Sequence, residues 1–197
     1  MGLMVHSLEG IPEEHHRDYY IYLLDYGWQE PLSDILIKNF GRMAAFASEQ
    51  KNAVVIMKTD SGVHFSDEVL SWHSINGDNA DEDQLLPAIL VTNRHPAIFR
   101  KRASVSENEE VEENLKLVLF PLKKHCKDSP EVITLIQTIF SKIKQGQDLD
   151  NFKITSEKKK GFRGAIAHSI ILEPNFSGLG FSFNKFWKYL NDDKKLN

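Results

Sequence analysis

Short apolar runs alternate with amphipathic segments along the first part of the chain. Residues 19–26, YYIYLLDY, are nearly all apolar or aromatic, which is typical of a strand buried on both faces of a sheet. Residues 53–58, AVVIMK, form a second run of this kind. Between the two runs, apolar residues recur at helical spacing from Leu36 to Ala47. The pattern therefore predicts strand, helix, strand, with the two strands parallel and joined by a right-handed crossover.

The same alternation continues toward the C-terminus. A second helix is expected to begin at Ser66 and to end at Gly77. Residues 87–93, PAILVTN, and residues 115–122, LKLVLFPL, are further apolar runs and predict two more strands. The helix expected from Ser129 has the best-defined apolar face in the chain, and lysines in its last turn suit the helix dipole.

The change of pattern along the chain divides it into three parts. We expect an N-terminal arm at 1–18, an α/β core at 19–150, and a C-terminal extension at 151–197 that packs on the core or on a partner. The extension carries an apolar strand within 165–172 and a short amphipathic helix around 184–190.

Composition fits a soluble globular protein. Of the 197 residues, 41% are hydrophobic and 26% are charged, and the net charge of −4 gives no general attraction to nucleic acid. No apolar run approaches the roughly 20 residues that cross a bilayer, and the N-terminal residues do not resemble a signal peptide, so no membrane association is expected. The one cysteine, Cys126, cannot form an internal disulfide, which favours a cytoplasmic protein.

Pro87 stands at the entry to the third predicted strand. From about residue 20 to 145 the predicted order is strand, helix, strand, helix, proline-led strand, strand, helix, and this order resembles the thioredoxin-like fold, with a central mixed sheet flanked by helices. In that family the third core strand is entered through a cis-proline, so the resemblance implies a cis bond at Pro87. A generic α/β sandwich without this kinship is the alternative.

The redox activity of that family is not implied for this chain. The family's cysteine pair would fall within residues 25–34, DYGWQEPLSD, which contain Trp28 but no cysteine. Disulfide exchange requires a thiolate. The resemblance therefore implies the fold and not the activity.

A polar cluster follows the third predicted strand. In open α/β sheets, ligands bind beyond the carboxyl ends of parallel strands. Arg94 would hold a carboxylate or phosphate, with Asn93 and His95 as further donors and Trp28 as a stacking wall. The alternative is that Asn93 and Pro96 make a turn while Arg94 and His95 point into solvent.

Cys126 is the other residue with reactive chemistry. Lysines on both sides and a helix N-terminus three residues later would lower the pKa of its thiol. No second cysteine is present to resolve a mixed disulfide, so a thiol without a chemical role is the favoured interpretation. No closely spaced pair of histidines or cysteines indicates a metal site, and no cofactor is expected.

Two segments of the C-terminal extension are candidate interaction surfaces. An aromatic stripe at helical spacing would dock on its own domain or bind a partner: Phe183, Phe186, Trp187 and Leu190. A basic run would contact the phosphates of nucleic acid, or is simply a solvated loop: Lys158, Lys159, Lys160 and Arg163.

These features lead to two hypotheses about function. The first is a non-catalytic binding or accessory subunit of an intracellular protein assembly, interacting with a protein partner or as a homo-oligomer, because paired catalytic residues are absent while charged loops and the aromatic stripe are present. The second is a small-molecule or nucleotide-binding enzyme with its site at Trp28, Arg94 and His95.

Overall fold

The described residues form a mixed sheet with helices on both faces. The structure is a computed structural model and describes residues 1–13, 16–26, 31–62, 64–72, 85–98, 117–147 and 170–172. Within them the sheet has six strands in the order β1-β3-β2-β4-β5-β6. The strands are β1 (Gly2–Val5), β2 (Tyr19–Leu24), β3 (Ala53–Lys58), β4 (Ala88–Thr92), β5 (Leu117–Pro121) and β6 (Ile170–Leu172). This confirms the predicted α/β class with a central mixed sheet flanked by helices.

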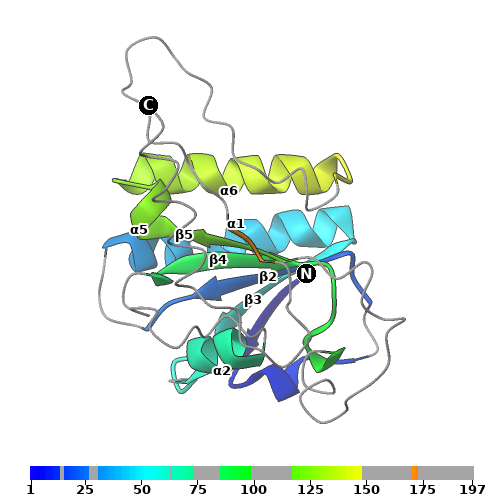
Figure 1. The fold of residues 1–197 in the computed structure, drawn as a ribbon. Coiled ribbons are helices and arrows are strands. Elements are labelled where there is room, and N and C mark those ends of the chain that lie inside the picture. The colour runs from blue at the N-terminus through cyan, green and yellow to red at the C-terminus, as the bar shows by residue number, and fades with distance from the viewer. Residues whose placement is uncertain are drawn as a thin grey trace, which may run out of the picture.

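The helices cover the sheet in two layers (Figure 1). The described helices are η1 (Leu8–Gly10), α1 (Pro31–Gln50), α2 (Phe65–Trp72), α5 (Leu122–His125) and α6 (Ser129–Lys144). The long helices α1 and α6 pack on one face, and α2 and η1 pack on the other. The three central strands β2, β4 and β5 are buried along their whole length, because helices or loops cover both faces.

Alternate residues of the central strands belong to two separate cores. Ile21 and Leu23 of β2 face α1 and α6, while Tyr20 and Tyr22 face α2. This division follows from the two-residue period of a strand. It also explains why the sequence of β2 shows a continuous apolar run and no alternation of apolar and polar residues.

Strand directions decide which loops meet. β2 and β3 are parallel, which confirms the predicted crossover through α1. β2 and β4 are antiparallel, with Tyr20 opposite Thr92 and Leu24 opposite Ala88. The end of β2 therefore lies beside the start of β4, and the residues after β4 lie at the other edge of the sheet. We call the end of the sheet at which β1, β3 and β2 terminate the carboxyl edge. It is formed by strand ends and differs from the lateral edge of the sheet, which is formed by the outer strand β1.

The segment 1–18, expected as an arm, contributes an edge strand. β1 runs parallel to β3, with Gly2 opposite Val55 and Val5 opposite Lys58. A Cβ at Gly2 would collide with the Cβ of Ala44 in α1, so glycine permits the strand to pass directly under the helix. The sequence pattern did not indicate β1, because four residues are too few to show a period.

Local backbone and capping features mark the start of β4 and both ends of α6. The peptide bond between Leu86 and Pro87, immediately before β4, is cis. α6 begins after Asp128, whose side chain accepts a hydrogen bond from the N–H of Glu131 at 3.0 Å. The helix ends before Gly146, which has a φ of 62°, a conformation that glycine adopts at little cost. The predicted start of this helix at Ser129 is confirmed.

Candidate functional site

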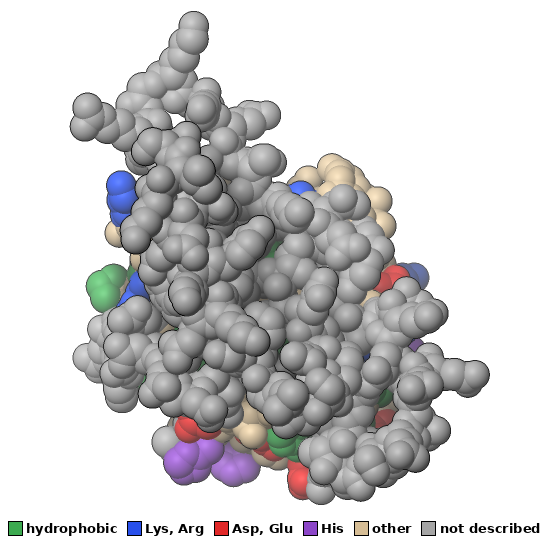
Figure 2. Space-filling model, in the orientation of Figure 1, with side chains coloured by type: hydrophobic (Ala, Val, Ile, Leu, Met, Phe, Trp, Pro, Cys, Tyr) green, Lys and Arg blue, Asp and Glu red, His purple; other side chains and the backbone are tan. Residues whose placement is uncertain are grey.

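Polar side chains gather at the carboxyl edge, where three parallel strands end. His6 follows β1, Asp25 follows β2, and Lys58 is the last residue of β3. Open α/β sheets bind ligands in this position because the loops there diverge from the strand ends and carry polar groups. Figure 2 shows histidine and acidic side chains side by side along the lower border of the molecule, near the position of α2 in Figure 1.

The centre of this edge is a buried ion pair. The Nζ of Lys58 lies 3.2 Å from the Oδ1 of Asp25, and the side chains are 16% and 1% exposed. An isolated carboxylate at such depth would carry a large desolvation cost, which the neighbouring ammonium offsets. The pair therefore holds the partly exposed cation of Lys58 in a fixed position at the end of the sheet.

Ser66 fixes the backbone of Asp25 from the opposite side. Its Oγ donates a hydrogen bond to the Asp25 carbonyl at 2.7 Å and accepts one from the Asp25 N–H at 3.1 Å. The sequence predicted that this helix begins at Ser66, whereas α2 begins one residue earlier, at Phe65, and Ser66 ties the helix to β2. The start of α2 thus positions the buried carboxylate.

The hydroxyl groups of two side chains and the imidazole of a third form a series of contacts in the turn that follows Lys58. The Oγ of Ser61 is 3.3 Å from the Nδ1 of His6 and 3.3 Å from the Oγ1 of Thr59. Gly62 closes the turn, since its N–H donates to the Thr59 carbonyl at 2.9 Å. A Cβ at Gly62 would lie 3.2 Å from both the His6 carbonyl and the Lys58 Cβ. The lack of a side chain at this position therefore brings His6 and Lys58 together.

This arrangement suits binding better than nucleophilic catalysis. His6 and Ser61 are both exposed to water, and 3.3 Å is long for a hydrogen bond that activates a hydroxyl group. A fixed ammonium with neighbouring hydroxyl and imidazole groups instead offers hydrogen bonds to an acidic or polar group of a ligand. These residues were not predicted from the sequence, although Asp25 and Lys58 directly follow the apolar parts of two predicted strands.

The predicted site around Trp28 and Arg94 is not assembled as expected. Arg94 follows β4 and lies at the edge opposite the end of β2. Trp28 lies outside the described residues. The prediction that Tyr26 lies near the residues after β4 is wrong for the described residues, because the register places Tyr26 and Arg94 at opposite ends of β2. It assumed that β4 is parallel to β2, whereas the two strands are antiparallel.

His95 contributes to the turn after β4. It is 8% exposed, its ring packs edge to face on Tyr20 with the centroids 5.4 Å apart, and its Nδ1 accepts the N–H of Ala97 at 3.1 Å. Arg94 is half-buried, and its backbone N–H donates to the Oγ1 of Thr92 at 3.4 Å. Asn93 is half-buried in the same turn. The geometry favours the alternative interpretation of this segment as a turn, except that His95 is buried.

The Cys126 thiol is held in its protonated form. Burial, together with the nearby carboxylates of Glu131 and Asp128, raises the pKa of Cys126 to about 12. The flanking lysines were expected to lower this pKa, but burial of the thiol is the largest influence, and the acidic first turn of α6 acts in the same direction. At neutral pH the thiol carries no thiolate character for exchange chemistry.

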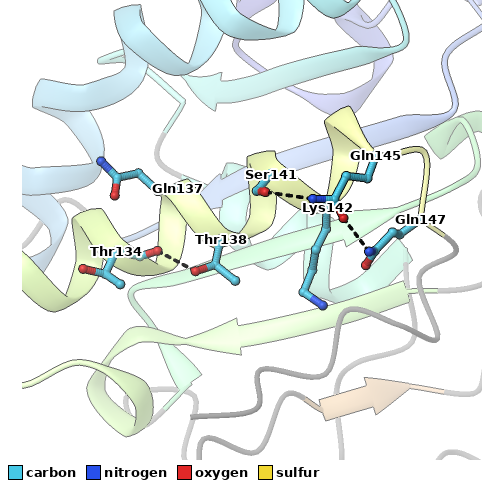
Figure 3. Close-up of a pocket in the computed structure, with 7 residues that line it drawn as sticks. All are labelled: Thr134, Gln137, Thr138, Ser141, Lys142, Gln145 and Gln147. Atoms are coloured by element: carbon cyan, nitrogen blue, oxygen red, sulfur yellow. Dashed lines mark hydrogen bonds between the residues drawn. The ribbon is translucent and has the colours of Figure 1, made fainter. Parts of the chain in front are cut away.

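A shallow groove on the outer face of α6 is the second polar surface of the described residues (Figure 3). It has a volume of about 390 Å³, and its lining is neutral apart from one lysine: Thr134, Gln137, Thr138, Ser141, Lys142, Gln145 and Gln147. The hydroxyls of Thr134 and Thr138 donate to carbonyls one turn earlier in the helix, and Gln145 donates to Ser141. Because these groups mainly bond one another, the groove does not form the stronger candidate site.

The remaining predicted sites fall outside the described residues. They are the aromatic stripe of Phe183, Phe186, Trp187 and Leu190, and the basic run of Lys158, Lys159, Lys160 and Arg163. Within the described ranges, no cluster of three histidine, cysteine or acidic residues is arranged to hold a metal ion. No helix in that part of the chain has both the length and the apolar character to cross a bilayer.

Comparison with known proteins finds no match among protein families, curated proteins or solved structures.

Proposed function

We propose that this protein is a non-catalytic binding or accessory subunit of an intracellular protein assembly, built on a thioredoxin-like fold without redox activity. Its carboxyl edge is the binding face. The order of elements from β2 to α6, with Pro87 leading into β4, supports the kinship inferred from the sequence. Helix α2 and the turn at Gly62 border this face and shape it.

The observation that carries the proposal is the Asp25–Lys58 pair. Replacing a buried ion pair with apolar residues of the same size is often neutral or stabilising, so the presence of this pair at the rim of the sheet favours a role in recognition. The single thiol of the chain lies elsewhere, buried beside α6 with a pKa of about 12. Binding without thiol exchange is therefore the function that the geometry supports best.

The described residues give less support to the enzyme hypothesis with a site at Trp28, Arg94 and His95. The antiparallel register of β2 and β4 places Arg94 at the opposite end of β2 from Tyr26. The burial of His95 and its bond to Ala97 give that side chain a structural role.

The test compares partner capture by three forms of the full chain. The double variant Asp25→Asn, Lys58→Met removes both charges of the pair while retaining the size of the side chains. Lys144→Met removes one exposed cation from the last turn of α6 and serves as the matched control. After cross-linking in cells of its source, we expect the double variant to lose the specific partner that wild type and Lys144→Met retain.

Two results would contradict the proposal. The same partners with all three folded forms would show that the carboxyl edge is not the binding face. Turnover of a dithiol or disulfide substrate by the purified chain would contradict the absence of redox activity.

A further inference from the structure

We propose that the outer edge of β1 and the adjoining side of α1 bind a second copy of this chain. The two copies of β1 pair antiparallel across a two-fold axis that passes midway between the two copies of Leu3, and the sheets of the two copies become continuous. This inference concerns a different surface from the carboxyl edge and does not depend on the proposed function.

The backbone of β1 has one satisfied side and one open side. The backbone N–H and C=O groups of Met1, Leu3 and Val5 are directed toward β3. The Val55 N–H donates to the Met1 carbonyl and the Thr59 N–H donates to the Val5 carbonyl, both at 2.9 Å. Alternation along the strand directs the N–H and C=O groups of Gly2 and Met4 away from β3. Among the described strands, only β3 pairs with β1. An antiparallel partner centred on Leu3 would take up these groups, with Gly2 of each copy opposite Met4 of the other.

The side chains beside this open edge are apolar and exposed. Within the described residues the exposed large hydrophobic side chains are Met4 at 53%, Ile37 at 47% and Ile133 at 38%. Met4 shares a face of β1 with Gly2, which packs against Ala44 and Phe40 of α1. Ile37 lies on the same side of α1 as these two residues, at helical spacings of three and seven. Two of the three exposed apolar side chains thus border one edge of the molecule.

The helix also has space for a second helix at this edge. Gly41 is exposed, and a Cβ built on it meets nothing within 4 Å. Since α1 packs on both β1 and β3, and neighbouring strands are about 4.8 Å apart, the two copies of α1 would lie about 10 Å apart across the axis. Packed helices have axes about 8–10 Å apart, and small residues permit the closer distances.

The position of Gly41 fits the axis. Gly2 packs on Ala44, and Leu3 lies about 3.3 Å further along the strand, which corresponds to about two helical residues back along α1. The axis through Leu3 therefore passes close to Gly41, so the two copies of Gly41 face each other. Ile37 lies one turn to one side of this point and approaches Ala45 of the second copy.

Charge and shape favour a second copy over a charged partner. β1 carries no charged side chain, although edge strands are commonly protected by lysine or proline. The N-terminal ammonium of Met1 donates to the Ala53 carbonyl at 3.2 Å, on the β3 side of the strand, and Asp34 and Lys38 of α1 form a pair at 3.8 Å. A two-fold contact places each bulky residue opposite a small one. One short strand and one helix make a small interface, so we expect reversible association.

Sedimentation equilibrium of the full chain tests the inference, from about 1 to 200 µM at moderate salt. The wild type is expected to pass from monomer to dimer within this range. Met4→Lys and Gly41→Gln should each weaken the dimer at least tenfold, because the first puts charge at the strand edge and the second fills the space at the axis. Ile133→Lys, a change at the apolar residue exposed on α6, should leave the dimer unchanged.

Gly41→Gln also separates association from folding. Glutamine is the better helix former and meets no neighbour in the single copy, so the melting temperature of the monomer should not fall. A wild-type chain that stays monomeric at the highest concentration would overturn the inference. So would a dimer that Met4→Lys and Gly41→Gln leave intact, or slow amide exchange at Gly2 and Met4 in the monomer, which would show that the chain covers its own edge.

Discussion

Asp25 and Lys58 illustrate how two ordinary strand-end residues become a fixed site. Each follows a run of buried apolar residues, and the parallel pairing of β2 with β3 brings them within 3.2 Å. Ser66 then holds the Asp25 backbone from α2. Neither strand contains enough information by itself to define the site, which exists only once the strands are paired.

The ion pair gives a prediction about stability. Lys58→Met should lower the free energy of unfolding by roughly 3 kcal/mol, because it leaves the buried carboxylate of Asp25 without its partner. The double variant Asp25→Asn, Lys58→Met should be less destabilised than the single variant, since no charge is then stranded. Urea unfolding of the three variants in a double-mutant cycle measures the difference.

Additive effects of the two substitutions would contradict this view. In that case the two side chains would act independently, and the contact would have no energetic role.

The titration of buried hydroxyl and thiol groups gives a second prediction, about alkaline pH. Burial raises the pKa of Cys126 from 9.0 to about 12 and raises the pKa of Tyr22 well above 10.0. Between the ordinary and the raised pKa of each group, the unfolded chain has released a proton that the folded chain retains. The free energy of unfolding is therefore highest below about pH 9 and falls as the pH rises toward 12. Cys126→Ala should make the decline shallower.

Thiol labelling provides an independent measurement of the same property. At pH 8 a small alkylating reagent should modify the folded chain far more slowly than the urea-unfolded chain, because only the thiolate reacts. Equal rates in the two states would show that the Cys126 thiol is accessible and ionised.

At the scale of elements, α6 is defined by its first turn. The Asp128 side chain accepts the N–H of Glu131 at 3.0 Å, and the Glu131 side chain accepts the N–H of Lys127 at 2.7 Å, a reciprocal arrangement that satisfies two otherwise open donors.

Asp128→Ala should therefore lower the free energy of unfolding by about 1 kcal/mol. Asp128→Asn keeps the acceptor and should retain most of that stability. It should also reduce the pKa of Cys126 toward its ordinary value, because the Asp128 charge contributes to the shift. Thermal unfolding of both variants checks the cap, and the two variants being equally stable would indicate that the side-chain hydrogen bond contributes nothing.

Most elements could be predicted from the sequence, but not the direction of every strand. Period and capping residues indicated the helices α1 and α6 and the strands β2, β3 and β5. β4 is buried at every residue, so its pattern is the same whether it runs parallel or antiparallel to β2. The direction of β4 depends on the connection between β3 and β4 and cannot be predicted from the residues of β4 alone.

At the scale of the molecule, this one direction determines which residues form a site. With β4 antiparallel, Arg94 moves to the edge where β2 begins, and the carboxyl edge is left to Asp25, Lys58 and His6. The sequence supplied the buried strands that carry these residues. It could not supply the neighbours of each residue, because these depend on pairing across long stretches of chain.

A pair of distances between spin labels tests this arrangement most directly. The buried, protonated Cys126 allows selective labelling of cysteines introduced at exposed or half-buried positions. The register predicts that labels at Asp18 and Arg94 lie close together, within about 10 Å at Cα, while labels at Asp60 and Arg94 lie about 20 Å or more apart. A short distance between positions 60 and 94, with a long one between 18 and 94, would contradict the antiparallel register and the candidate site derived from it.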